Sequence, residues 1–193
     1  MKILAVVGSP RRNGNTHIVV RKIAEGAKAK GAAVKEIFLG DLTIAECDGC
    51  HCCWEAEKCS KDDDMQQIYE QIVESDGFIF GTPVYWYGPT ALMKAFVDRF
   101  VYFNCEKNRK KIRGKRAVLA VPFEEEDEQT ASLVEEFFDK SLNYLEMAVS
   151  GKVLVAGVGK KGDVLKKKEK LNEAFDLGSA LVTQIEMDKG KKA

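Results

Sequence analysis

Five of the six cysteines in this sequence crowd into one segment, ECDGCHCCWEAEKC at residues 46–59. Four of them have the spacing C-x2-C-x2-C-x5-C, namely Cys47, Cys50, Cys53 and Cys59. Because each iron of a 4Fe-4S cluster takes one cysteine, a compact loop with four suitably spaced cysteines can surround such a cluster. Four thiolates also satisfy tetrahedral zinc, although two near-equal pairs would be more usual, and a redox-active dithiol is a third alternative. The segment therefore predicts metal or redox chemistry, with Cys52 as an extra thiol.

A second chemical candidate is the segment GSPRRNGNT at residues 8–16, which follows the apolar run 3–7 and precedes a helical pattern. A strand that feeds a glycine-bearing loop and then a helix points several free backbone N–H groups, with the positive end of the helix dipole, at one place. Hydroxyl, amide and guanidinium side chains add further donors and positive charge. These side chains are Ser9, Arg11, Arg12, Asn13, Asn15 and Thr16. The loop is expected to bind a phosphate group.

The motifs that this loop lacks restrict which phosphate it can bind. A P-loop would need a lysine after its last glycine, but Gly14 is followed by Asn15, so the lysine for the outer phosphates is missing. The dinucleotide pattern G-x-G-x-x-G is missing as well. A mononucleotide phosphate bound without metal is the simplest interpretation, and the alternative is an ordinary polar turn capped by Asn15 or Thr16.

A third segment, TPVYWYG at residues 82–88, carries three consecutive aromatic side chains. Tyr85, Trp86 and Tyr87 cannot all point inward, so at least one is expected to stack on a flat ligand. The alternative is that these rings fill the edge of the core or an oligomer interface.

The composition excludes several classes of protein. Hydrophobic residues make up 45% of the 193, which suits one domain over residues 1–193 with a cysteine-rich loop at 47–59. Lysine plus arginine (30) equals aspartate plus glutamate (30), so no overall field favours nucleic acid or an anionic membrane, and small molecules are the expected partners. The sequence has no apolar run of membrane-spanning length, and Met1 and Lys2 lead directly into the first strand, so we expect a cytoplasmic protein.

Apolar runs alternate with helix-period segments along the whole chain. The expected strands are residues 2–7, 33–39, 77–81, 116–121 and 152–155, and the expected helices are residues 15–30, 62–75, 90–103, 128–147 and 164–185, the last one loosened at Gly178. This alternation predicts an open parallel sheet with helices on both faces, and ligands of such sheets lie outside the carboxyl ends of the strands. The rule brings the loops at 8–16, 82–88 and 122–127 together into one site.

These motifs resemble the flavodoxin-like NADPH-dependent FMN reductase superfamily and, within it, the iron-sulfur flavoproteins. The resemblance rests on GSPRRNGNT, the cysteine segment, KDDDM at residues 61–65 and GTPVYWYGPTALMKAFVDR at residues 81–99. It covers most of residues 1–103, while the rest of the chain is similar to the family only in the length and order of its elements. The resemblance implies a doubly wound five-stranded parallel sheet with the strand order 2-1-3-4-5.

In that family the first loop holds the phosphate of FMN and the aromatic loop lines the isoalloxazine ring. The residues implied for the phosphate are Ser9, Arg11, Asn13, Asn15 and Thr16, and those implied for the ring are Pro83, Val84, Tyr85 and Trp86. The cysteine segment fits the cluster-binding motif of the iron-sulfur flavoproteins, with Cys47, Cys50, Cys53 and Cys59 as ligands. The third loop, PFEEEDEQ at residues 122–129, departs from the glycine-rich loop of many relatives, so the resemblance assigns it no flavin contact.

The expected function is that of an FMN-dependent oxidoreductase whose flavin exchanges electrons with a 4Fe-4S cluster. Its partners are small-molecule or protein electron donors and acceptors, with NAD(P)H as a candidate donor, and no catalytic acid or base is obligatory. One alternative is a cluster-free NAD(P)H-dependent FMN or quinone-type reductase, and another, from a different class, is an electron carrier like flavodoxin. The resemblance also implies a homodimer or homotetramer.

Overall fold

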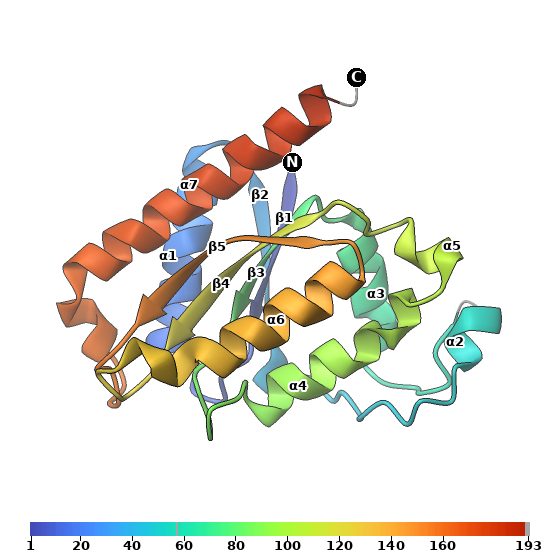
Figure 1. Ribbon diagram of the computed structural model, residues 1–193, viewed down its shortest axis with the longest axis horizontal. Helices are drawn as coiled ribbons and strands as arrows, with labels where there is room; N and C mark the ends of the chain where they lie inside the picture. The colour runs from blue at the N-terminus through green and yellow to red at the C-terminus, as the bar shows by residue number, and fades with distance from the viewer. Residues whose placement is uncertain (57, 192–193) are drawn as a thin grey trace.

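Five parallel strands form one sheet in the order β2-β1-β3-β4-β5 (Figure 1). The computed structural model describes residues 1–56 and 58–191, so Glu57 of the cysteine segment lies outside the described residues. The strands are β1 (Lys2–Val7), β2 (Ala33–Phe38), β3 (Gly77–Gly81), β4 (Arg116–Pro122) and β5 (Ala148–Val155). The number, direction and order of the strands confirm the predicted flavodoxin-like, doubly wound fold.

Side chains alternate along each strand between two apolar cores, one on each face of the sheet. In β1, Leu4 and Val6 belong to one core, while Ala5 and Val7 belong to the other. Figure 1 shows the helices that cover the two faces. The first core lies under α3 (Met65–Glu74), α4 (Ala91–Asp98) and α6 (Ser132–Tyr144), and the second lies under α1 (Asn15–Ala29) and α7 (Lys168–Gly190). Burial on both faces explains why the central strands are continuous apolar runs in the sequence.

Helices α1 and α7 touch through their backbones at two glycines. A Cβ atom on Gly26 would lie 1.9 Å from the carbonyl oxygen of Phe175, and one on Gly178 would lie 1.8 Å from that of Ile23. The prediction that the last helix loosens at Gly178 is therefore wrong: α7 runs through this residue without interruption, and glycine is needed there for close packing.

Several element boundaries differ from the predicted ones. The helix expected at 90–103 is α4 followed by a 3₁₀ helix, η2 (Arg99–Phe103). The helix expected at 128–147 is η3 (Glu128–Ala131) followed by α6, and η4 (Asp163–Lys166) precedes α7. Strand β5 begins at Ala148, four residues earlier than expected, and its pairing with β4 shifts register between Ala117 and Val118.

Three short helices were not predicted from the sequence pattern. They are η1 (Leu39–Asp41), α2 (Cys52–Glu55) and α5 (Glu106–Arg109). Each is too short to show a helical period, and α2 lies inside the cysteine segment. Within the described part of the chain, no helix has both the length and the apolar character needed to cross a bilayer.

Candidate functional site

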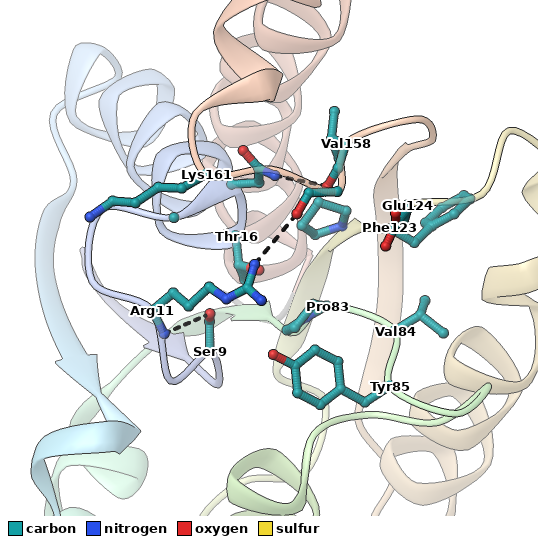
Figure 2. A pocket seen from close by; sticks show the side chains of 14 residues that line it. Ser9, Arg11, Thr16, Pro83, Val84, Tyr85, Phe123, Glu124, Val158 and Lys161 are labelled. Atoms are coloured by element: carbon teal, nitrogen blue, oxygen red, sulfur yellow. Dashed lines mark hydrogen bonds between the residues drawn. The ribbon is translucent and has the colours of Figure 1, made fainter.

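The loops that follow β1, β3, β4 and β5 surround one pocket at the carboxyl edge of the sheet (Figure 2). Its volume is about 110 Å³. The lining residues are Ser9, Arg11, Gly14, Asn15, Thr16, Pro83, Val84, Tyr85, Pro122, Phe123, Glu124, Val158, Gly159 and Lys161. The convergence of the loops at 8–16, 82–88 and 122–127, which the strand order predicts, is thus present in the structure.

The backbone of the first loop is fixed against its neighbours on both sides. The N–H of Gly8 donates to the carbonyl oxygen of Gly81 at 2.7 Å, and the hydroxyl of Thr90 donates to the carbonyl oxygen of Gly8. A Cβ atom on Gly8 would lie 2.8 Å from the side chain of Met93, so a larger residue would not fit. The loop then opens α1 at Asn15 with Gly14 as its N-cap, and neither Asn15 nor Thr16 is the cap. The first N–H groups of α1 therefore remain available for an anion.

Three of the five predicted phosphate-binding side chains converge on this pocket. Ser9 and Thr16 are buried, and the Ser9 hydroxyl oxygen accepts a hydrogen bond from the N–H of Arg11 at 3.2 Å, so its own proton can still be donated. Arg11 extends into the pocket, where one guanidinium nitrogen lies 3.4 Å from the carbonyl oxygen of Gly159 (Figure 2). Two hydroxyl donors and one cation thus face the same space.

Asn15 lines the pocket, but its side chain is fully used elsewhere. Its amide nitrogen donates to the carbonyl oxygens of Val158 at 2.8 Å and Lys160 at 2.9 Å. Its amide oxygen accepts from the N–H groups of Gly162 at 3.0 Å and Val164 at 3.3 Å. Since an asparagine amide has two donor hydrogens and one oxygen with two lone pairs, nothing is left for a phosphate. The prediction of a phosphate contact from this side chain needs correction: Asn15 fixes the loop that follows β5.

Asn13 also departs from its predicted role, because it is exposed and does not line the pocket. It adopts a left-handed backbone conformation (φ 54°), and its N–H donates to Nδ1 of His17 at 3.1 Å. The other ring nitrogen of His17 lies 2.8 Å from a carboxylate oxygen of Glu36. With Nδ1 as acceptor, Nε2 carries the proton toward Glu36, so His17 ties the first loop to β2.

The aromatic loop presents three of its four predicted ring contacts to the pocket. Pro83, Val84 and Tyr85 line it, and Figure 2 shows them opposite Arg11 and Ser9. Trp86 does not line it: its side chain is 97% exposed, so the predicted contact is not formed in this structure. The backbone explains this orientation. Tyr85 and Gly88 exchange two backbone hydrogen bonds, and the two residues between them have positive φ angles, so this tight turn carries the indole into solvent.

Sequence reasoning missed the fourth side of the pocket, which Val158, Gly159 and Lys161 form after β5. The signal that could have revealed it is the glycine-rich sequence GVGKKG at residues 157–162. Gly159 lies against Glu124: a Cβ atom at this position would lie 2.7 Å from the carboxyl carbon of that side chain. The acidic third loop thus packs against this glycine-rich loop, and Glu124 itself reaches the pocket.

The cysteine segment passes below α4 and continues to α2 (Figure 1). Cys53 is buried, whereas Cys50 and Cys52 are exposed. Burial, followed by the neighbouring thiols of Cys59, Cys47 and Cys50, raises the pKa of Cys53 to about 11. Among the described residues, no three His, Cys, Asp or Glu side chains approach closely enough to hold a single ion.

The middle and the last residue of the cysteine segment are hydrogen bonded to the rest of the protein. The Trp54 indole N–H donates to the carbonyl oxygen of Val101 at 2.7 Å, and the Gln66 side chain donates to that of Cys59 at 2.9 Å. The buried guanidinium of Arg99 lies 3.2 Å from the sulfur of Cys59.

Helix α4 connects the two candidate sites. Its N-cap, Thr90, bonds Gly8 in the first loop, and Arg99, directly after its last residue, bonds Cys59. Arg99 lies eight positions after Ala91 in the sequence, which corresponds to about 12 Å along a helix axis. The pocket and the cysteine segment therefore lie at the two ends of one short rigid element.

Comparison with known proteins gives one family. The model of the family described as NADPH-dependent FMN reductase matches residues 1–161 of this chain.

Individual relatives add detail. An iron-sulfur flavoprotein of Methanocaldococcus jannaschii is 38% identical over 99 residues, which are 51% of this chain and 51% of that protein. One of Methanosarcina thermophila is 37% identical over 101 residues, 52% of this chain and 53% of that protein. The chain thus spans about half the length of the curated relatives it matches. The crystal structure of an FMN-dependent NADH-azoreductase from Bacillus anthracis, in complex with FMN, superimposes with a TM-score of 0.72 at 13% identity, covering 94% of this chain and 100% of that one.

Proposed function

This chain belongs to the NADPH-dependent FMN reductase family, and with it to the FMN-dependent oxidoreductases; on that premise we propose that it binds FMN in the pocket between the first loop and the aromatic loop. The observation that carries the proposal is the convergence of the first N–H groups of α1, two hydroxyls and Arg11 on the same space that Pro83, Val84 and Tyr85 border. Bound flavin supplies electron transfer in steps of two or one.

In this proposal the chain's own residues hold and orient the cofactor. Ser9 and Thr16 donate hydrogen bonds to the phosphate, and Arg11 neutralises its charge. The pocket of about 110 Å³ is smaller than the roughly 300–1,000 Å³ that buries a drug-sized ligand. The pocket would therefore hold the phosphate end, and Val84 and Tyr85 at its rim would border the ring, to which a donor such as NAD(P)H would deliver electrons.

For the cysteine segment we propose a 4Fe-4S cluster held by Cys47, Cys50, Cys53 and Cys59. Support comes from the spacing of the four cysteines and from the names of the iron-sulfur flavoproteins that match about half of the chain. Such a cluster would let the protein couple a two-electron donor to one-electron partners. The second candidate function, a cluster-free reductase, is favoured by the azoreductase structure, whose fold covers nearly the whole chain.

We further propose a single domain over residues 1–193 in a cytoplasmic homodimer or homotetramer. The support is the large exposed aromatic surface of the turn at 85–88, which a second subunit could cover.

The cluster proposal is tested by anaerobic reconstitution with iron and sulfide. Wild-type protein is expected to be brown and to hold about four irons and four sulfides per chain. The Cys50→Ala variant should lose both, whereas the matched Cys52→Ala variant should keep them, since Cys53 preserves the motif spacing. An iron-free, flavin-containing wild type that oxidises NAD(P)H with a dye acceptor would favour the cluster-free reductase. Flavin without such turnover would favour the electron carrier.

A further inference from the structure

Arg99 is the buried charged side chain that neither the phosphate pocket nor the cysteine motif explains. It is 1% exposed and lies at the start of η2. Placing an isolated cation in the interior costs free energy, so a guanidinium at this position needs hydrogen-bond and ionic partners that compensate for its lost hydration.

Its partners come from both ends of the cysteine segment. Nη1 donates to the carbonyl oxygen of Ala45 at 2.9 Å, two residues before Cys47, and Nη2 donates to the sulfur of Cys59 at 3.2 Å. Arg99 thus bridges the point where the chain enters the segment and the last cysteine in it. The planar fork of arginine holds these donors in one fixed geometry, which the freely rotating ammonium group of a lysine does not provide.

Asp63 holds the guanidinium in this orientation. Its two carboxylate oxygens accept from both terminal nitrogens of Arg99, and one of them also accepts from the N–H of Ala45 at 3.0 Å. The Asp63 side chain is 5% exposed, so the pair is shielded from water and from salt. The Nε of Arg99 is buried without a hydrogen-bond partner in the described part of the chain, so the geometry is set by the two terminal nitrogens.

We propose that Arg99 is a positioning residue that holds Cys59 in place and raises the reduction potential of the cluster bound by the cysteine segment. The inference rests on the proposed cluster. Reduction adds one negative charge to the cluster, and a buried cation with an N–H···S bond to a ligand stabilises the added charge. Asp63 opposes this effect because its charge is negative, but the group in contact with the Cys59 sulfur is the Nη2 of Arg99, at 3.2 Å.

The test compares reduction potentials of anaerobically reconstituted variants, measured by a redox titration monitored by electron paramagnetic resonance. Arg99→Gln should lower the potential, and Asp63→Asn, which leaves the cation uncompensated, should raise it. We expect each change to be at least tenfold in the one-electron equilibrium, which is about 59 mV. A purely structural role would destabilise both variants without moving their potentials in opposite directions.

Two further variants cover the case in which a single substitution prevents folding. The double variant Arg99→Gln/Asp63→Asn removes both charges but keeps amides that can hydrogen bond, and its potential should lie below that of the wild type. Arg99→Lys keeps the charge but loses the fork, so its potential should lie between those of the wild type and Arg99→Gln. Unchanged potentials in folded, cluster-loaded variants would overturn the inference. A wild type that takes up no iron would instead overturn the proposed cluster.

Discussion

Asn15 and Thr16 are adjacent in the sequence, but their side chains serve different parts of the molecule. Asn15 makes four hydrogen bonds to the backbone of residues 158–164, whereas the buried Thr16 lines the pocket. A sequence pattern places both in one polar loop and cannot tell them apart. The difference depends on the loop after β5, which lies more than 140 positions away and becomes a neighbour only when the sheet forms.

This difference predicts that substitutions at the two neighbouring positions affect different properties: the stability of the protein at Asn15 and the affinity for FMN at Thr16. Asn15→Ala leaves four backbone groups without their partner and should lower the free energy of unfolding by about 1–3 kcal/mol. Thr16→Val keeps the side-chain shape but removes the hydroxyl, so it should weaken FMN binding by about 1.5–3 kcal/mol, roughly 10- to 100-fold, with little change in stability. Urea denaturation and a flavin titration of both variants measure the two effects. Unaltered FMN affinity in Thr16→Val would remove this hydroxyl from the phosphate site.

The buried pair of Asp63 and Arg99 predicts how stability depends on pH. Burial raises the pKa of Asp63, but the hydrogen bonds from Arg99 and from the N–H of Ala45 lower it by more. The pKa of Asp63 therefore lies below its usual range. Because the pKa is lowered in the folded state, the pair stabilises the protein fully above the unfolded pKa of about 3.9. This contribution is lost as the pH falls through the folded pKa.

Asp63→Asn leaves the buried cation of Arg99 uncompensated and should cost about 3–5 kcal/mol at pH 7. The gap in unfolding free energy between this variant and the wild type should then shrink when the pH falls below about 4. Denaturation series at pH 7, 5 and 3 provide the measurement. A gap that stays constant over this range would show that the carboxylate charge does not contribute.

At the scale of elements, the contact between α1 and α7 reverses the usual effect of replacing a helical glycine. Helix propensity alone predicts that Gly178→Ala raises the free energy of unfolding by about 1 kcal/mol. Here the added methyl group would lie 1.8 Å from the carbonyl oxygen of Ile23, so the two helices must separate. We expect the free energy of unfolding of Gly178→Ala to fall by about 1–3 kcal/mol or more.

Gly190→Ala is the matched control, because a Cβ atom at this position of α7 meets nothing within 4 Å. It should leave stability unchanged or raise it by up to about 1 kcal/mol. Thermal unfolding of the two variants separates packing from propensity. Equal stabilisation by both substitutions would mean that α1 and α7 do not touch as the structure shows.

The elements also show which parts of the fold the sequence could predict. Strands β1, β3 and β4 are apolar runs bounded by turns or charges, and the prediction finds all three to within one residue. The start of β5 was missed because Ala148, Val149 and Ser150 are only half-buried on an edge strand, where the apolar signal is weak. The turn of Trp86 toward solvent was missed for a different reason: it depends on two left-handed residues that no composition rule anticipates.

At the scale of the whole molecule, α4 links the pocket to the cysteine segment. Thr90 bonds the first loop at one end of the helix, and Arg99 bonds the cysteine segment at the other. The position of α4 is therefore fixed by hydrogen bonds to both candidate sites.

We propose that this pocket holds FMN by its phosphate. Titrating the apoprotein with FMN and with riboflavin, which carries the same ring without a phosphate, tests this by flavin fluorescence. We expect one FMN per chain and riboflavin binding at least about 100-fold weaker, since two or more charge-assisted bonds of about 1.5–3 kcal/mol each are lost. Equal affinity for the two flavins, or no binding of FMN, would contradict it.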